Sequence, residues 1–160
     1  MILAGGCFWG IEDLIKKLPG VISTEVGYTG GYIQNPTYEV VKKNQSGHAE
    51  AVKIIFDPNK TSYEEILTYF FKIHDPTTVN RQGNDIGSQY RSSIFYHDEE
   101  LFKIAKKIIK KINESHVWNR EVVTTVEKLK KFYPAEEYHQ KYLQKHPDAS
   151  TCHFERKLSF

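Results

Sequence analysis

The stretch MILAGGCFWGIEDLIKKLPG, residues 1–20, sets the start of the fold. Its first four residues are apolar and are followed by Gly5 and Gly6, which permit a sharp change of chain direction. Apolar side chains then recur at helical spacing up to a Pro-Gly pair: Phe8, Ile11, Leu14, Ile15 and Leu18. The stretch therefore predicts a strand, a tight turn and a helix, with Cys7 at the turn.

The composition is that of one globular domain. The chain has 160 residues, of which 39% are hydrophobic and 26% are charged, which is enough for one well-formed core. Its 22 basic and 20 acidic residues are spread along the sequence, so no region is expected to bind nucleic acid or an anionic membrane. No apolar run reaches the roughly 20 residues of a membrane span, and the N-terminus does not resemble a signal peptide. We expect a cytoplasmic protein that acts as a monomer.

Hydrophobic periodicity predicts that strands and helices alternate along the rest of the chain. Further strands are expected at residues 21–30, 48–56, 90–97 and 120–129. Helices are expected at residues 61–74, 98–112 and 134–146, with a short helical turn near Tyr38. This order favours a mixed sheet covered by helices in one α/β or α+β domain.

Local signals indicate where two of these helices begin and where a functional loop lies. Thr61 followed by Glu64 forms a capping-box pattern, and Pro134 is suited to the first turn of the last helix. Residues 76–89 form a long polar segment between a predicted helix and the next strand. Long loops in compact domains are often functional, so we expect part of a site in this segment.

The chain has only two cysteines, Cys7 and Cys152, so a disulfide scaffold is not expected. Neither lies in a C-x-x-C motif, no H-E-x-x-H motif occurs and the histidines are scattered, so the sequence predicts no metal site. Cys7 would open a helix, whose N-terminal N–H groups lower a thiol pKa and favour the nucleophilic thiolate. A structural cysteine packed behind Phe8 and Trp9 is the alternative, and placement alone leaves both interpretations open.

A second candidate group lies in the strand HAEAVKIIF, residues 48–56. Alternation puts Glu50 on the same side as Val52 and Ile54, whereas Lys53 lies on the opposite side. A carboxyl group buried there would have a raised pKa, would be protonated near neutral pH and could donate a proton. A solvated glutamate at a strand end is the alternative.

Several short motifs, taken together, are similar to one enzyme family. They read GGCFWG (5–10), GYTGG (27–31), NPTYEVV (35–41), GHAEAV (47–52), RQGNDIGSQYRS (81–92) and AEEYHQKYL (135–143). Their order and their span, from residue 2 to about 146, resemble the peptide methionine sulfoxide reductases of the A type. The resemblance implies an α+β fold, a two-layer ferredoxin-like sandwich whose mixed sheet is covered by helices.

The resemblance also implies how five residues would reduce methionine S-sulfoxide, free or in proteins. Cys7 would attack the sulfoxide sulfur and would become a sulfenic acid. Glu50 would protonate the sulfoxide oxygen, because oxide is a very poor leaving group. Tyr38 and Tyr90 would hydrogen-bond the same oxygen, and Asp85 would support the site through its loop. From the sequence alone, these last three could equally be turn and surface residues.

An apolar pocket and a second thiol follow from the same resemblance. Phe8 and Trp9 would receive the methyl group of the substrate. Cys152 would attack the Cys7 sulfenic acid to give a disulfide, which thioredoxin would reduce, without a metal or other cofactor. Residues 1–146 would then form the catalytic domain, and residues 147–160 a tail that carries Cys152. This tail has no glycine, whereas the tail of the family is usually glycine-rich.

Two other functions fit the residues considered without the resemblance. A thiol peroxidase would also form a sulfenic acid on Cys7, but it would require neither Glu50 nor the aromatic pair. A peptide-binding module would use Phe8 and Trp9 as a pocket, with Cys7 serving only in packing. Replacing Cys7 by serine would leave the binding module intact and would inactivate both enzymes.

Overall fold

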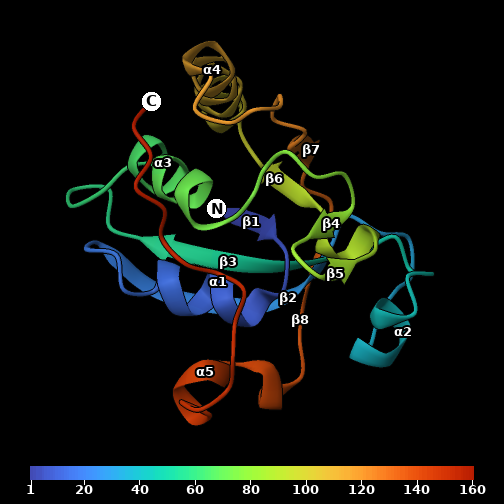
Figure 1. The fold of residues 1–160 in the computed structure, drawn as a ribbon. Coiled ribbons are helices and arrows are strands. Elements are labelled where there is room, and N and C mark those ends of the chain that lie inside the picture. The colour runs from blue at the N-terminus through green and yellow to red at the C-terminus, as the bar shows by residue number, and fades with distance from the viewer.

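The computed structural model describes residues 1–160 and contains a six-stranded sheet with helices packed on it (Figure 1). Its elements are β1 Ile2–Gly5, α1 Phe8–Ile15, β2 Val21–Thr29, α2 Tyr38–Lys42, β3 Ala49–Phe56, α3 Tyr63–Ile73, β4 Arg81–Gln82, β5 Asp85–Ile86, η1 Ser88–Tyr90, β6 Ser92–Tyr96, α4 Glu99–Ser115, β7 Thr125–Lys128, β8 Phe132–Pro134, η2 Glu137–His139 and α5 Tyr142–Lys145. No helix has both the length and the apolar character needed to cross a membrane.

The sheet has the strand order β7-β6-β1-β3-β2-β8, in which only the β6–β7 pair is parallel. Its four central strands, β6-β1-β3-β2, are connected through α1 and α3 as β-α-β-β-α-β, the ferredoxin-like arrangement. Helix α4 crosses from β6 to the edge strand β7, and β8 extends the opposite edge. The expected α+β fold with a mixed sheet is confirmed.

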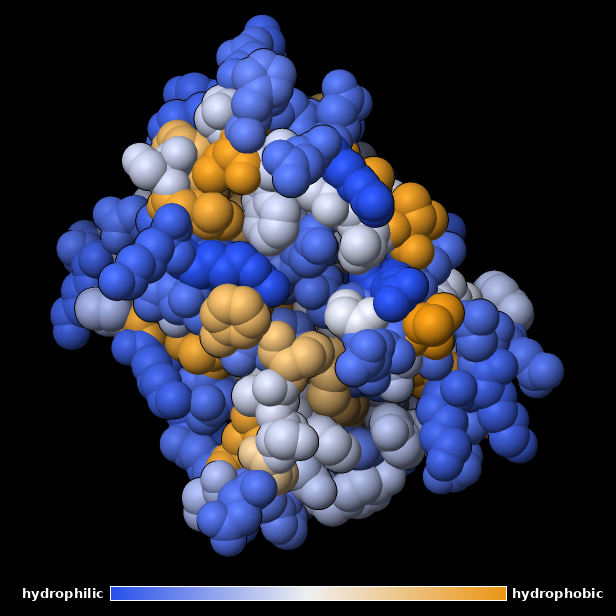
Figure 2. Space-filling model, in the orientation of Figure 1, coloured by the Kyte–Doolittle hydropathy of each residue, from blue (hydrophilic) through white to orange (hydrophobic).

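Alternating side chains give the sheet two different faces. Val52 and Ile54 belong to the main core of 20 buried residues, which the apolar sides of α1, α3 and α4 complete. Ala49 and Ala51 belong to a smaller cluster on the other face, against which Phe132 packs. The helices turn their polar sides outward, and Figure 2 shows a mainly hydrophilic surface on which hydrophobic residues form small separate groups. The alternation predicted for the strand at 48–56 is confirmed.

Helix α3 begins one residue later than the capping pattern predicts. Ser62, with extended φ and ψ of −144° and 166°, is the N-cap, and its side chain accepts a hydrogen bond from the N–H of Glu65. Thr61 is buried and instead donates its hydroxyl proton to Glu65 Oε2 at 3.1 Å. The capping-box prediction based on Thr61 and Glu64 is therefore wrong by one position, although the helix itself is confirmed.

The helix predicted at residues 134–146 is wrong. Pro134 ends β8, which pairs with β2, and the N–H of Ala135 donates to the carbonyl oxygen of Val26 at 2.9 Å. The side-chain amide of Gln140 then bonds both the N–H and the carbonyl oxygen of Val26, each at 2.9 Å. These bonds to the sheet edge take the place of helical ones, so only the 3-10 turn η2 and the short α5 are helical.

Two predicted strands are shorter than expected. The strand predicted at 120–129 is reduced to β7, because the N–H groups of Val122 and Val123 donate to Asn113 Oδ1 and to the carbonyl oxygen of Pro76, both at 2.8 Å. The strand predicted at 90–97 begins only at Ser92, because Tyr90 closes the 3-10 turn η1. The first difference thus arises from bonds to distant parts of the fold, and the second from a local turn.

The C-terminal tail, residues 147–160, runs from α5 across α1 toward α3 (Figure 1). His153 of this tail is buried, and its ring Nε2 lies 2.7 Å from the carbonyl oxygen of Gly5 at the end of β1. Further along, the N–H of Arg156 donates to the carbonyl oxygen of Lys72 in α3 at 2.9 Å. The tail is therefore attached to the domain on both sides of Phe154.

Candidate active site

Cys7 lies at the N-cap of α1, directly after the turn that ends β1. Gly6 in that turn has a φ of +101°, outside the range that other residues adopt readily. A Cβ atom on Gly6 would also lie 2.6 Å from Gln82 Cγ, so a side chain has no room there. The glycine pair thus lets the chain turn sharply and place Cys7 at the start of a helix, as the sequence predicted.

A cleft of about 350 Å³ opens beside Cys7. Its walls come from the turn after β1, from α2, from the segment around β5 and η1, and from the tail. It is lined by Cys7, Trp9, Tyr38, Asn84, Asp85, Tyr90, Ser150, Thr151 and Cys152. Six of the eight site residues expected from the sequence therefore meet around one cavity, although they come from four separate parts of the chain.

The other two expected residues, Phe8 and Glu50, lie behind this cleft and do not line it. Phe8 is 1% exposed and Glu50 is 2% exposed. The backbone N–H of Phe8 donates a hydrogen bond to Glu50 Oε1 at 3.2 Å, which joins α1 to β3. The pKa of Glu50 is raised to about 8, because burial raises it by more than the hydrogen bond from Phe8 lowers it. The carboxyl group is therefore mainly protonated at neutral pH, as the sequence predicted.

The pKa of Cys7 is raised, which is opposite to the prediction from the helix N-terminus. Burial of the thiol is the largest cause, and the negative charge that Glu50 carries when ionised is the next. The backbone N–H of Trp9 lowers the pKa of Cys7, but this effect is smaller than that of burial. Cys7 in this state is a neutral thiol beside a carboxyl group that is itself mainly neutral.

Tyr38 and Tyr90 bring two phenol groups to the cleft from different elements. Tyr38 is the first residue of α2, and its N–H donates to Glu136 Oε2 at 3.0 Å. Burial, and then the charge of Glu50, raise the pKa of Tyr38 to about 12 and raise the pKa of Tyr90 further. Neither hydroxyl has a hydrogen-bond partner within the protein, so both remain protonated donors for a ligand.

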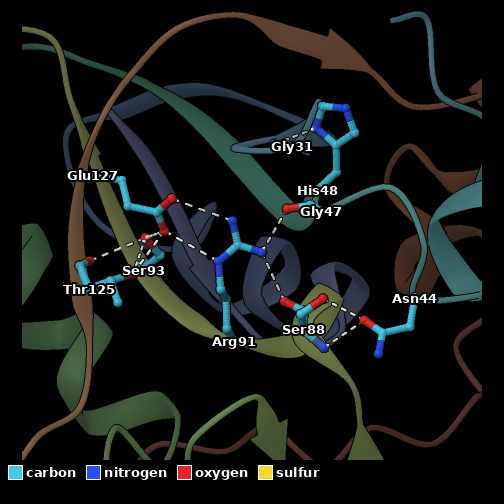
Figure 3. Close-up of polar contacts among 9 residues, drawn as sticks. All are labelled: Gly31, Asn44, Gly47, His48, Ser88, Arg91, Ser93, Thr125 and Glu127. Atoms are coloured by element: carbon cyan, nitrogen blue, oxygen red, sulfur yellow. Dashed lines mark hydrogen bonds and ion pairs between the residues drawn. The ribbon is translucent and has the colours of Figure 1, made fainter. Parts of the chain in front are cut away.

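Arg91, which the sequence reasoning did not single out, holds the turn that carries Tyr90. Figure 3 shows its guanidinium group between Glu127 and two carbonyl oxygens. It donates to the carbonyl oxygens of Gly47 and Ser88 at 3.1 and 3.0 Å, and to Glu127 Oε2 at 3.2 Å. Gly47 precedes the strand of Glu50, so one side chain joins the Tyr90 turn to the start of β3. Its place within the motif at residues 81–92 was the only signal in the sequence.

Trp9 is held in the cleft wall by two residues from the C-terminal part of the chain. Its indole N–H donates to His139 Nδ1 at 3.0 Å. Its ring stacks on Tyr142, with the ring centres 3.7 Å apart and the planes 10° apart. His139 also lies against Phe8, with ring centres 5.2 Å apart. The sequence reasoning missed the roles of His139 and Tyr142, although both lie in the motif at residues 135–143.

Cys152 is exposed and lines the same cleft as Cys7, and both thiols are free. The lack of glycine in the tail thus does not keep Cys152 away from the cleft, because the buried His153 fixes the tail beside the Cys7 turn. Around the cleft and elsewhere, the structure contains no group of three or more His, Cys, Asp or Glu side chains that could hold a metal ion. The arrangement offers two thiols, one buried acid and two phenol donors.

Known proteins are similar to this chain in sequence and in fold. The family model described as peptide methionine sulfoxide reductase matches residues 1–159. Peptide methionine sulfoxide reductase MsrA 2 of Rhodopirellula baltica is 56% identical over 155 residues, which cover 97% of this chain and 90% of that protein. Mxr1 from Saccharomyces cerevisiae in reduced form matches with a TM-score of 0.92 and 36% identity, covering 98% of this chain and 91% of that chain. Mxr1 in complex with Trx2 matches with a TM-score of 0.65 and 26% identity, covering 98% and 88%.

Proposed function

This chain belongs to the peptide methionine sulfoxide reductase family, and on that premise we propose that it reduces the S epimer of methionine sulfoxide, free or in proteins, at Cys7. One observation carries the assignment of the site. The Cys7 turn opens into a cleft, and the buried, protonated Glu50 is hydrogen-bonded to the residue that follows Cys7. A nucleophile and a proton donor therefore stand at the same helix start.

In the first step, the Cys7 sulfur attacks the sulfoxide sulfur while the oxygen of the substrate receives the Glu50 proton. The hydroxyl group then passes from the substrate sulfur to the Cys7 sulfur: the sulfur–oxygen bond of the substrate and the bond between the two sulfurs break as the new bond from Cys7 to oxygen forms. This gives methionine and a sulfenic acid on Cys7. The methionine sulfur gains two electrons and the Cys7 sulfur loses two. The Cys7 proton leaves with the attack and restores the protonated Glu50, so that atoms and charge balance.

Aromatic side chains hold the substrate for this step. Trp9 faces the cleft and provides the apolar surface for the methyl group, while Phe8 lies behind it and supports the same wall through His139. The free hydroxyls of Tyr38 and Tyr90 donate hydrogen bonds to the sulfoxide oxygen. Asp85, also in the cleft wall, would support the loop that leads to Tyr90 from its place in β5, which pairs with β4.

The second step uses the thiol of the C-terminal tail. Cys152 attacks the Cys7 sulfenic acid, and a Cys7–Cys152 disulfide and water are formed. The position of both thiols on one cleft supports this pairing. Residues 1–146 would then perform the reduction and residues 147–160 would regenerate Cys7. The complex of the yeast relative with Trx2 supports thioredoxin as the reductant of the disulfide, and the two free thiols suit the reducing cytoplasm.

A single-turnover experiment tests this proposal. Reduced protein is mixed with each sulfur epimer of a methionine sulfoxide peptide, and methionine release and free thiols are followed in time. We expect one methionine per protein from the S epimer and the loss of two thiols. Cys152→Ser should release the same methionine but keep a sulfenic acid on Cys7. Methionine release by Cys7→Ser, or equal rates with both epimers, would refute the proposal.

A further inference from the structure

The ring of His153 has a defined tautomer because of its contact with β1. Its Nε2 lies 2.7 Å from the carbonyl oxygen of Gly5, and a carbonyl oxygen can only accept a hydrogen bond. The proton of the neutral ring must therefore be on Nε2. His153 is 5% exposed, and burial lowers its pKa, which keeps the ring neutral near pH 7. Nδ1 consequently carries an unprotonated lone pair that can accept a hydrogen bond or a proton.

This lone pair faces the residues immediately before His153. Nδ1 lies 3.8 Å from Cys152 Sγ and 3.5 Å from Thr151 Oγ1. Gly10 in α1 provides the space for this edge of the ring, because a Cβ atom there would overlap both His153 Nδ1 and Thr151 Oγ1. The helix that begins at Cys7 thus also seats the histidine beside the second thiol.

We propose that His153 is the general base that deprotonates Cys152 when Cys152 attacks the Cys7 sulfenic acid. This inference rests on the proposed function, which makes Cys152 the resolving thiol. The Cys152 Sγ–H bond breaks, its proton passes to His153 Nδ1, and an S–S bond forms as the S–O bond of Cys7 breaks. The departing hydroxide takes the proton from Nδ1 and leaves as water, so the ring returns to its neutral tautomer.

The surroundings of the two groups explain why a base is needed. Partial desolvation of the thiol at the cleft, and then the charge of Asp85, raise the pKa of Cys152, so this thiol is protonated near neutral pH. Asp85 raises the pKa of His153 and Arg156 lowers it, and the neighbouring His74 is fully buried and neutral at this pH. His153 therefore stays neutral but lies next to a carboxylate that stabilises its protonated form during the reaction.

The test separates methionine release from disulfide formation in single turnovers. In His153→Gln, the side-chain NH₂ group can still donate to the Gly5 carbonyl oxygen, but no basic nitrogen remains. We expect an unchanged rate of methionine release and disulfide formation at least about 100-fold slower at pH 7. The slow rate should then rise about tenfold per pH unit, because hydroxide must now ionise Cys152. His146→Gln, an exposed histidine of the same tail, is the matched control.

Several outcomes would overturn the proposal. One is disulfide formation by His153→Gln at the wild-type rate. Another is a decrease by the same factor at every pH, which would indicate that His153 only positions the tail. A third needs no variant: disulfide formation in the wild-type protein that rises tenfold per unit from pH 7 to pH 9 would show that no base assists Cys152. A wild-type protein that releases no methionine would instead refute the proposed function.

Discussion

The backbone N–H of Phe8 donates a hydrogen bond to Glu50 Oε1 at 3.2 Å and so connects the first residue of α1 with the second residue of β3. Cys7 immediately precedes Phe8, and Glu50 is 2% exposed. The proposed nucleophile and the proposed acid are thus linked through one hydrogen bond, from the backbone of the residue after Cys7 to the side chain of Glu50. The proposed acid, Glu50, is thus a buried residue and does not line the cleft.

Glu50→Gln should slow methionine release by about 10²- to 10⁴-fold at pH 7, which is the usual contribution of a general acid. The amide oxygen of glutamine can still accept the hydrogen bond from Phe8, so the fold should be retained. The measurement is single-turnover release of methionine, with circular dichroism as a check of folding. Glu64→Gln, an exposed glutamate on α3, is the control. An unchanged rate in Glu50→Gln would exclude Glu50 as the proton donor.

The pH dependence of the same step should follow the protonation of Glu50. Its pKa is raised to about 8, and the protonated form is the one that acts. The contribution of Glu50 should therefore be complete well below pH 8 and should decline as the pH rises through that value. We expect the ratio of wild-type to Glu50→Gln rates to decrease above pH 8. A ratio that stays constant from pH 6 to pH 10 would contradict this assignment.

Arg91→Lys should lower both stability and activity, although Arg91 does not line the cleft. The guanidinium group bonds the carbonyl oxygens of Gly47 and Ser88 together with the Glu127 carboxylate, and a lysine ammonium group cannot reproduce this planar set. We expect a loss of about 1–3 kcal/mol in the free energy of unfolding and a decrease in kcat/KM, because the turn of Tyr90 is released. Urea unfolding and steady-state kinetics measure the two effects.

The exposed Arg120 gives a matched control for this prediction, since Arg120→Lys changes the same functional group on the surface. If the stability and kcat/KM of Arg91→Lys equal those of Arg120→Lys, the network around Arg91 does not position Tyr90. A loss of stability with unchanged kcat/KM would assign Arg91 to the fold alone.

The parts of the fold that the sequence predicted correctly are those governed by local patterns. The turn at Gly5-Gly6 and the inward side of Glu50 follow from backbone freedom and from strand alternation, which need no knowledge of distant contacts. The segment 134–146 differs, because its backbone groups bond to Val26 at the edge of the sheet. A helical pattern in the sequence cannot reveal that such tertiary partners exist.

For the chemistry of the site, too, local patterns in the sequence predicted one part and tertiary contacts decided the other. The motifs identified the residues that surround the cleft, but the direction of the Cys7 pKa depends on how far the thiol is buried and on its distance from Glu50. The roles of His139, Arg91 and His153 also depend on tertiary contacts, because each side chain hydrogen-bonds a group at least 40 residues away in the sequence. Residue identity predicted which groups take part, whereas their protonation states required the structure.

Two glycines near the cleft should respond very differently to a methyl group. Gly6 has a φ of +101° and Gly83 a φ of +59°, and only the second value lies in the left-handed region that residues with a Cβ atom can enter, at a cost in strain. A Cβ on Gly83 would lie 3.8 Å from Cys152 Cβ, whereas one on Gly6 would lie 2.6 Å from Gln82 Cγ. Gln82 cannot withdraw easily, because its amide bonds both the N–H and the carbonyl oxygen of Asp75, each at 2.8 Å.

We therefore expect Gly83→Ala to cost about 1 kcal/mol in the free energy of unfolding, from backbone strain alone. Gly6→Ala should cost more, about 2–4 kcal/mol, because the strain adds to the overlap with Gln82. Since Cys7 follows directly, the folded fraction of Gly6→Ala should also release methionine more slowly than the folded fraction of Gly83→Ala. Urea unfolding and single-turnover release on both variants measure this. If both variants lost the same free energy of unfolding and released methionine at the same rate, the Gly6 turn would adjust freely to a side chain. Its geometry would then not set the position of Cys7.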